Sequence, residues 1–218
     1  MTLYGSLLFI HIAGGFAALF SASVAIISKI VDGAHKWHIY SGRVYFAGMV
    51  TVFLTAIPMA ILKPNPFLFM IAIFSFYLAL SGWRLAKNRA GTPQTVDWII
   101  AGIMAITSVS MVAFGLYWLL GGESMGITII VFGAIGAAFS LADIRTFRTG
   151  GLRGKERIAS HLQRMMGATI ATLTAFIVTN FYIEPIVILW LAPTAVITPI
   201  ITIWSRKIMA GRRLKGMA

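Results

Sequence analysis

Long apolar runs recur along this sequence and constrain its fold more than any other feature. Several approach 20 residues, the length that an α-helix needs to cross a hydrocarbon core of about 30 Å. Every backbone N–H and C=O in that core must be paired internally, which favours helices. The apolar residues come in blocks and do not alternate with polar ones, so a transmembrane β-barrel is excluded. We therefore predict an all-α, polytopic membrane protein, with residues 1–218 forming one helical membrane domain.

Seven spans are expected, because clusters of glycine and proline separate the apolar runs. They cover approximately residues 3–28, 40–62, 66–86, 97–120, 124–146, 161–182 and 185–205. The first run is too long for the apolar part of a signal peptide and no basic segment precedes it, so we expect a retained span. The sequence thus predicts a seven-transmembrane-helix bundle.

The basic residues predict the orientation of the bundle. The chain has 18 Lys and Arg against 6 Asp and Glu, a net charge of +12. Such an excess can indicate nucleic-acid binding, but here the charges lie between apolar runs, as in membrane proteins. All but Lys63 fall in the first, third and fifth connections, at their helix ends, or in the C-terminal tail. The positive-inside rule places the N-terminus outside and the C-terminus in the cytoplasm. We expect a bacterial inner-membrane location and contacts with anionic lipid headgroups, but no nucleic-acid partner.

Two spans carry small residues at helical spacing. The residues are Gly15, Ala18, Ala22 and Ala25 in the first span and Gly133, Gly136, Ala137 and Ser140 in the fifth. Small faces let helix backbones approach closely in lipid, so we expect packing faces. The same faces leave open a homo-oligomer or a partner membrane subunit. Pro193 and Pro199 are expected to kink the seventh span.

Ionisable residues near the cytoplasmic ends of spans are the main candidates for function, because polar groups in lipid are costly. They are His38, Arg43 and Tyr45 at the second span, Asp143 at the fifth, and His161 and Arg164 at the sixth. His38 shares one helical face with Gly42 and Tyr45. We expect three helices to direct His38, Asp143 and His161 towards one point.

Imidazole binds haem iron and divalent metals, and a carboxylate can complete a zinc site or orient a ligating ring. The metal ligands are therefore predicted to be His38, His161 and Asp143. The cofactor is predicted to be haem b or a divalent metal such as zinc. Cofactor-binding residues would then be His38, His161, Tyr45, Arg43 and Arg164. An alternative is that Asp143 only pairs with Arg145 or Arg164. His11, about two turns below the outer surface, is a second candidate site.

The reaction, if any, has no sequence signature. With no cysteine, disulfides and cysteine-ligated metals are excluded. The chain has no His-Glu-x-x-His, Gly-x-Ser-x-Gly or P-loop motif, so catalytic residues are unassigned. Three interpretations compete: a redox-type haem or metal protein, a carrier of small solutes or anions, and a non-catalytic membrane accessory protein.

Three histidine motifs resemble an uncharacterised family of bacterial multi-span membrane proteins, defined only as a domain of unknown function. They are His11-x-x-x-Gly15, His38-x-x-x-Gly42-Arg43-x-Tyr45 and His161-x-x-Arg164-Met165. The resemblance extends from the first span to the sixth, although the family has an aromatic residue where this chain has Arg164. It implies a small helical membrane protein with recurrent histidines and no defined activity.

A looser similarity is to di-haem cytochromes of the b561 and ferric-reductase type, which have histidines near both membrane faces. His11 has no second histidine at its depth. This similarity therefore implies at most one bis-histidine haem, held by His38 and His161.

Overall fold

The computed structural model describes residues 2–31 and 34–211, and within them it contains seven α-helices and no strand. The helices are α1 (Leu3–Ile30), α2 (His35–Leu62), α3 (Pro66–Lys87), α4 (Thr95–Leu120), α5 (Met125–Arg148), α6 (Gly154–Asn180) and α7 (Val187–Met209). Each is long and apolar enough to cross a membrane. The predicted all-α, seven-helix architecture of a multi-pass membrane protein is confirmed at this level.

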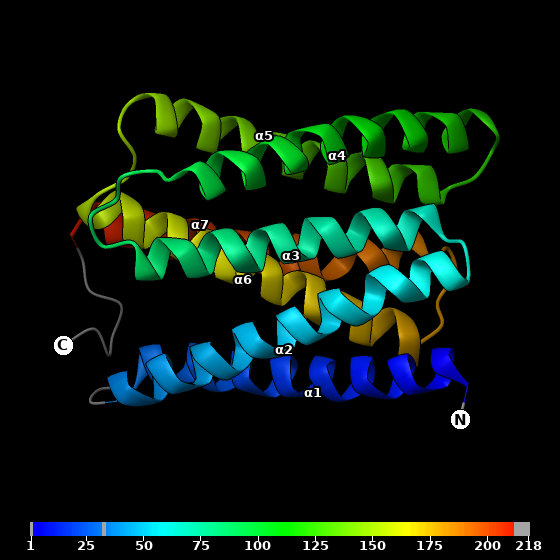
Figure 1. The fold of residues 1–218 in the computed structure, drawn as a ribbon, viewed down its shortest axis with the longest axis horizontal. Coiled ribbons are helices and arrows are strands. Elements are labelled where there is room, and N and C mark those ends of the chain that lie inside the picture. Colours follow the sequence, from blue (N-terminus) through cyan, green and yellow to red (C-terminus); the bar gives the residue numbers. More distant parts are fainter. Residues whose placement is uncertain (1, 32–33, 212–218) are drawn as a thin grey trace.

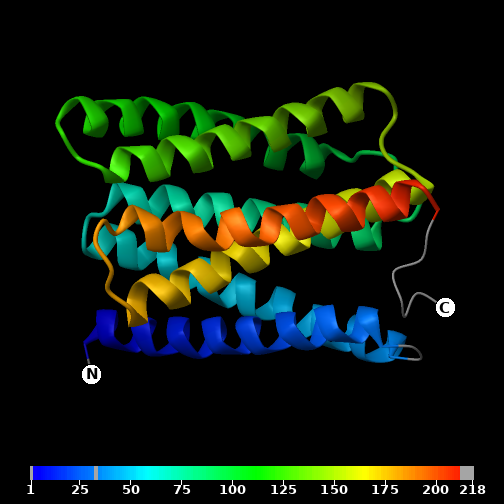
Figure 2. The same cartoon turned by 180° about the vertical axis from the view of Figure 1, so that it is seen from behind.

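Consecutive helices reverse direction, so every connection lies at one of two ends of the bundle (Figures 1 and 2). The connections after α1, α3 and α5 and the C-terminal end of α7 share one end, which we call the basic end. The N-terminus and the connections after α2, α4 and α6 lie at the opposite end. The alternate connections in which the sequence places the basic residues therefore lie together at one end of the bundle.

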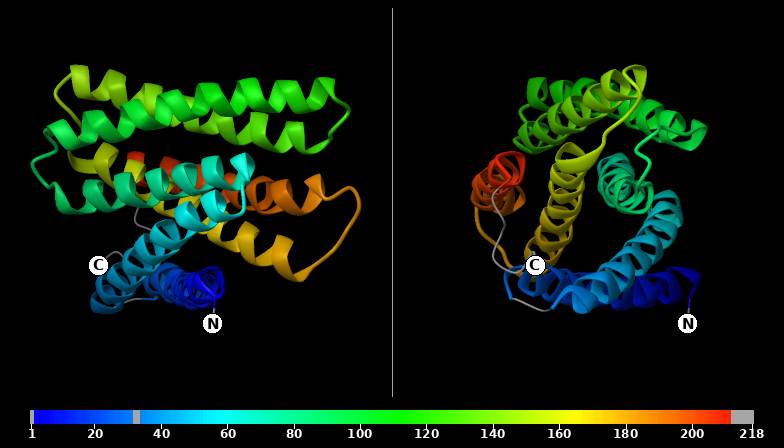
Figure 3. Two further views of the ribbon diagram at one scale, coloured as in Figure 1. Left: turned by 45° about the vertical axis from the view of Figure 1, so that its right-hand side comes forward. Right: turned by 90° about the vertical axis from the view of Figure 1, so that its left-hand side faces the viewer.

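The helices are arranged as two outer pairs and a central group (Figures 1 and 3). The α4–α5 pair lies on one side, the α1–α2 pair lies on the other, and α3, α6 and α7 lie between them. The structure tilts α6 so that its far end approaches α1, where the rings of Phe16 and Phe176 are 6.1 Å apart. The central α6 thus contacts the α1–α2 side of the bundle.

Small residues bring the paired helices close together. A Cβ at Gly126 of α5 would lie 2.5 Å from the Gly115 carbonyl oxygen of α4, too close for any side chain. Gly133 and Gly136 are also buried against α4, as their spacing predicts. The expectation for the first span was partly wrong, because Gly14, not Gly15, packs against α2. Gly15 faces open space instead.

At the basic end, the helices extend beyond the apolar runs from which they were predicted. The second begins at His35 instead of residue 40, and the sixth begins at Gly154 instead of residue 161. An apolar run marks the hydrocarbon core, whereas a helix can continue among headgroups where its polar side chains are solvated. His38 and His161 therefore lie within helices and not at their starts. The two prolines of the seventh span lie inside one continuous helix.

Local sequence signals explain where several helices begin. The Asn65 side chain accepts a hydrogen bond from Leu68 N, and Pro66 occupies the first turn of α3. Both are typical of helix starts, because Asn satisfies a free N–H and proline has none to satisfy. A capping box of Gln94 and Asp97 begins α4.

Two glycines join the connections at the basic end. Gly91, with a φ of +77°, follows α3, and Gly151, with a φ of +91°, follows α5. A Cβ at Gly151 would lie 1.8 Å from the Gly91 carbonyl oxygen, so only glycine permits this approach. Arg153 Nε also donates to the Ala90 carbonyl oxygen at 3.3 Å. These contacts hold the start of α6 beside the end of α3.

Candidate functional site

His38 of α2 and His161 of α6 lie next to each other near the basic end. Their ring centroids are 6.4 Å apart and their planes are nearly perpendicular, at 85°. Further along the same two helices, the Tyr45 hydroxyl lies 3.5 Å from the Thr172 hydroxyl. Side chains of α2 and α6 therefore meet at two levels along the helices, and the histidines form the contact nearer the basic end. We call His38 and His161 the histidine pair.

The hydrogen bonds of the two Nδ1 atoms show which tautomer each ring of the histidine pair adopts. His38 Nδ1 lies 3.0 Å from the Ala25 carbonyl oxygen of α1, and His161 Nδ1 lies 2.8 Å from the Gly82 carbonyl oxygen of α3. A carbonyl oxygen only accepts, so each Nδ1 carries the hydrogen and donates it. Each neutral ring then keeps a free lone pair on Nε2. Histidines that bind metals are oriented in the same way, by a hydrogen bond from the nitrogen that does not bind.

The charges around the histidine pair are positive. Lys29 of α1 lies near both rings, and Arg157 of α6 lies near His161. Among the residues that the structure describes, no group of three or more His, Asp or Glu side chains is placed to hold a metal ion. The pair therefore offers two neutral nitrogen donors in surroundings that favour a ligand bearing negative charge.

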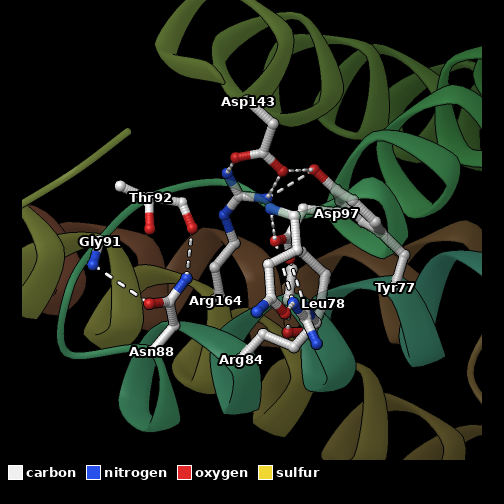
Figure 4. A network of polar contacts seen from close by, with 11 residues as sticks. Tyr77, Leu78, Arg84, Asn88, Gly91, Thr92, Asp97, Asp143 and Arg164 are labelled. Atoms are coloured by element: carbon white, nitrogen blue, oxygen red, sulfur yellow. Dashed lines mark hydrogen bonds and ion pairs between the residues drawn. The ribbon is translucent and has the colours of Figure 1, made fainter. Parts of the chain in front are cut away.

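Asp143 belongs to a separate buried network with Arg164 and Tyr77 (Figure 4). Its carboxylate accepts from Arg164 Nη2 at 2.5 Å, from Arg164 Nη1 at 3.0 Å and from the Tyr77 hydroxyl at 2.7 Å. Arg164 is 3% exposed and Asp143 is 8% exposed. This network joins α3, α5 and α6, and neither His38 nor His161 is part of it.

The predicted three-residue site of His38, Asp143 and His161 is therefore not formed. A buried carboxylate is costly unless it is paired, and Arg164 pairs with it through two nitrogens. That pairing also occupies Arg164, which had been predicted as a cofactor-binding residue. The structure thus agrees with the alternative prediction, in which Asp143 forms an ion pair with Arg164. Tyr77, which completes the network, was missed, although a tyrosine within an apolar run is a recognisable signal.

The remaining predicted residues on α2 differ in their surroundings. Tyr45 is 2% exposed and lies between α2 and α6. Arg43 is exposed. Gly42, about one turn beyond His38 on its helical face, has open space where a Cβ would be, with no atom within 4 Å. The site is thus composed of the histidine pair, Gly42 and Tyr45.

His11 lies in a different part of the molecule, towards the opposite end of α1. Its Nδ1 is 3.0 Å from the Thr55 hydroxyl of α2. It lines a cavity of about 1670 Å³ that extends along α6 from Tyr4 and Lys63 at the opposite end to Arg206 at the basic end. No second histidine shares its depth, as predicted from the sequence.

Comparisons of this chain with models of known protein families, with curated proteins and with solved structures find no match. Fold and site define a class only: a multi-pass helical membrane protein with two facing histidines between α2 and α6. Because one fold can support many functions, function has to be inferred from the site.

Proposed function

We propose that the protein binds one haem b through His38 and His161 and acts as a one-electron carrier in the membrane. The spacing of the two rings supports this best. An imidazole nitrogen lies about 1.1 Å from its ring centre and metal–nitrogen bonds are about 2.0–2.1 Å, so two rings that held one ion between them would have centres up to about 6.3 Å apart. The observed separation is 6.4 Å. When held by these two histidines, haem iron would supply one-electron redox chemistry.

The surroundings of the histidine pair favour haem over zinc. Zinc sites in proteins have three or four protein ligands, and Asp143, the predicted third ligand, is bound to Arg164 instead. Haem brings four nitrogens of its own and two carboxylates. Lys29 and Arg157 bring positive charge to the rings, which would favour those carboxylates. The same two cations would repel a free divalent metal ion.

An absorption spectrum of the gently purified protein, with elemental analysis, tests the proposal. We expect iron and haem at one per chain, and a Soret band that shifts on reduction. Protein that is colourless and free of iron, and that stays so when haem is offered, would refute it. Zinc at one per chain in a colourless protein would replace haem with the metal interpretation.

Gly42 provides a test of the space beside His38. Gly42→Leu should lower the bound haem by at least about tenfold, because the added side chain occupies the open space next to the ligand. Gly102→Leu in α4 is a matched control, since its Cβ also meets no atom within 4 Å. Both changes replace a helical glycine with a better helix former, so their effects on helix stability are alike. The measurement is haem absorbance per protein, and equal haem in the two variants would contradict the assignment.

We further propose that the basic end faces the cytoplasm of a bacterial inner membrane, with the N-terminus outside. A cysteine replacing Glu123, at the opposite end, should react with an impermeant thiol reagent added to intact cells. A cysteine replacing Thr149, at the basic end, should react only after the membrane is permeabilised. Both positions are exposed, whereas a side chain at Gly151 would collide with Gly91. The reverse labelling pattern would invert the orientation.

A further inference from the structure

His11 has a free hydrogen-bond acceptor inside the membrane-spanning region. The Thr55 hydroxyl, which lies 3.0 Å from His11 Nδ1, also lies 2.7 Å from the Thr51 carbonyl oxygen. A hydroxyl has one hydrogen, and the carbonyl can only accept it. His11 Nδ1 must therefore donate to Thr55, which leaves the lone pair on His11 Nε2. Among the described residues Nε2 has no hydrogen-bond partner and is not fully buried, and the Val52 carbonyl oxygen, a further acceptor for the His11 ring, lies 3.0 Å from the Thr55 hydroxyl, on the side of Nδ1.

The wall around His11 has room for a ligand. His11 and Gly15, about one turn deeper, both line the large cavity, and a Cβ at Gly15 would meet no atom within 4 Å. The volume of about 1670 Å³ exceeds the roughly 300–1,000 Å³ of sites for compact small molecules. Phe16, also on the wall, is 57% exposed, so the rim of the cavity reaches the lipid-facing surface. A molecule dissolved in the bilayer can enter from there.

The position of His11 indicates the shape of the ligand. His11 follows Leu3, the first residue of α1, by eight positions, which is about 12 Å along the helix axis. Beyond it, towards the middle of the bundle, the cavity is lined by apolar side chains such as Leu19, Met49 and Leu78. A polar head group at His11 and an apolar chain beyond it match this distribution.

We infer that His11 and Gly15 form a binding site for an amphiphile whose neutral head group carries a hydroxyl. His11 Nε2 accepts the hydrogen bond from that hydroxyl, and the chain lies along the apolar part of the cavity. The acceptor excludes head groups that offer only carbonyl or ether oxygens as specific partners. Two classes of membrane molecule have this chemistry, quinols and diacylglycerols. The site is independent of the haem proposal, because it shares no residue with the histidine pair.

Pairs of ligands with and without the hydroxyl test whether the head group donates a hydrogen bond to His11. Full-length protein in lipid nanodiscs would be titrated calorimetrically, without oxygen, with decylubiquinol and with decylubiquinone, which lacks the donor hydroxyls. A second pair would be dioleoylglycerol and its methyl ether. In at least one pair we expect the hydroxyl form to bind about fivefold more tightly, the effect of one neutral hydrogen bond. The pair that shows the preference identifies the source of the head group.

Variants of the protein test the roles of His11 and Gly15 in binding. In His11→Ala the two members of each pair should bind equally, whereas His11→Gln, which retains an acceptor oxygen, should recover part of the preference. Gly15→Leu should abolish binding of both members, and Gly102→Leu should leave it unchanged. Thermal unfolding of each variant checks that it is folded. Lack of binding in both pairs, equal binding within both, or a preference that survives in His11→Ala would overturn the inference.

Discussion

Replacing His38 or His161 by alanine is expected to remove nearly all bound haem from the purified protein. In the proposed site each ring would supply one ligand to the iron, and the other four donors would come from the haem itself. Loss of outer-shell partners of metal ligands typically costs 10–100-fold in affinity, so loss of a ligand should cost more than about a hundredfold. The measurement is the Soret absorbance per protein, together with haem affinity from titration of the haem-free variants.

The control variants distinguish ligand loss from a general loss of structure. His35→Ala changes an exposed residue at the start of α2, and His11→Ala changes the distant cavity site. Both should keep one haem per chain. Wild-type haem content in both His38→Ala and His161→Ala would show that the facing rings are only a packing contact. Loss of haem in His11→Ala alone would place the cofactor in the cavity instead.

The overall fold could be predicted because the apolar blocks report directly on the hydrocarbon core. Seven blocks separated by glycine and proline give seven helices, and backbone pairing in lipid leaves no alternative. Helix ends were less predictable. Residues 35–39 and 154–160 are polar or mixed, and only the structure shows that they belong to α2 and α6.

The candidate site could be predicted only in part, because sequence gives the depth of a residue but not its direction around the bundle. His38 and His161 share a depth and do meet. Asp143 shares that depth as well, yet it faces Arg164, because a long guanidinium side chain can reach it and a buried carboxylate requires a cation.

The partners that orient the histidines leave no trace in the sequence. The oxygens that accept from His38 and His161 belong to the backbone of Ala25 and Gly82, and any residue could supply them. Lys29 was recognised from the sequence only as part of the orientation signal. Its closeness to both rings depends on how α1 packs beside α2 and α6.

Breaking the Asp143–Arg164 ion pair is expected to destabilise the fold by about 3–5 kcal/mol, because either single substitution leaves a buried charge without its partner. Arg164→Ala leaves the Asp143 carboxylate with only the Tyr77 hydroxyl as a donor in the network. Asp143→Ala leaves the guanidinium against the Tyr77 hydroxyl and the Phe139 ring, 4.4 Å away. The free energy of unfolding, from denaturant titration in micelles, measures both effects.

A second ion pair of the same chemistry serves as the control. Arg84 pairs with Asp97, but their side chains are 21% and 13% exposed, against 4% and 11% for Arg164 and Asp143. Arg84→Ala should cost only about 0.2–1 kcal/mol, because Arg84 is the more exposed cation and the Asp97 carboxylate keeps its hydrogen bond from Gln94 N at the start of α4. The double variant Asp143→Leu with Arg164→Met removes both buried charges and should recover most of the stability lost in the single variants. If Arg164→Ala cost no more than Arg84→Ala, the network would not be desolvated, and α5 would be held to α6 by packing alone.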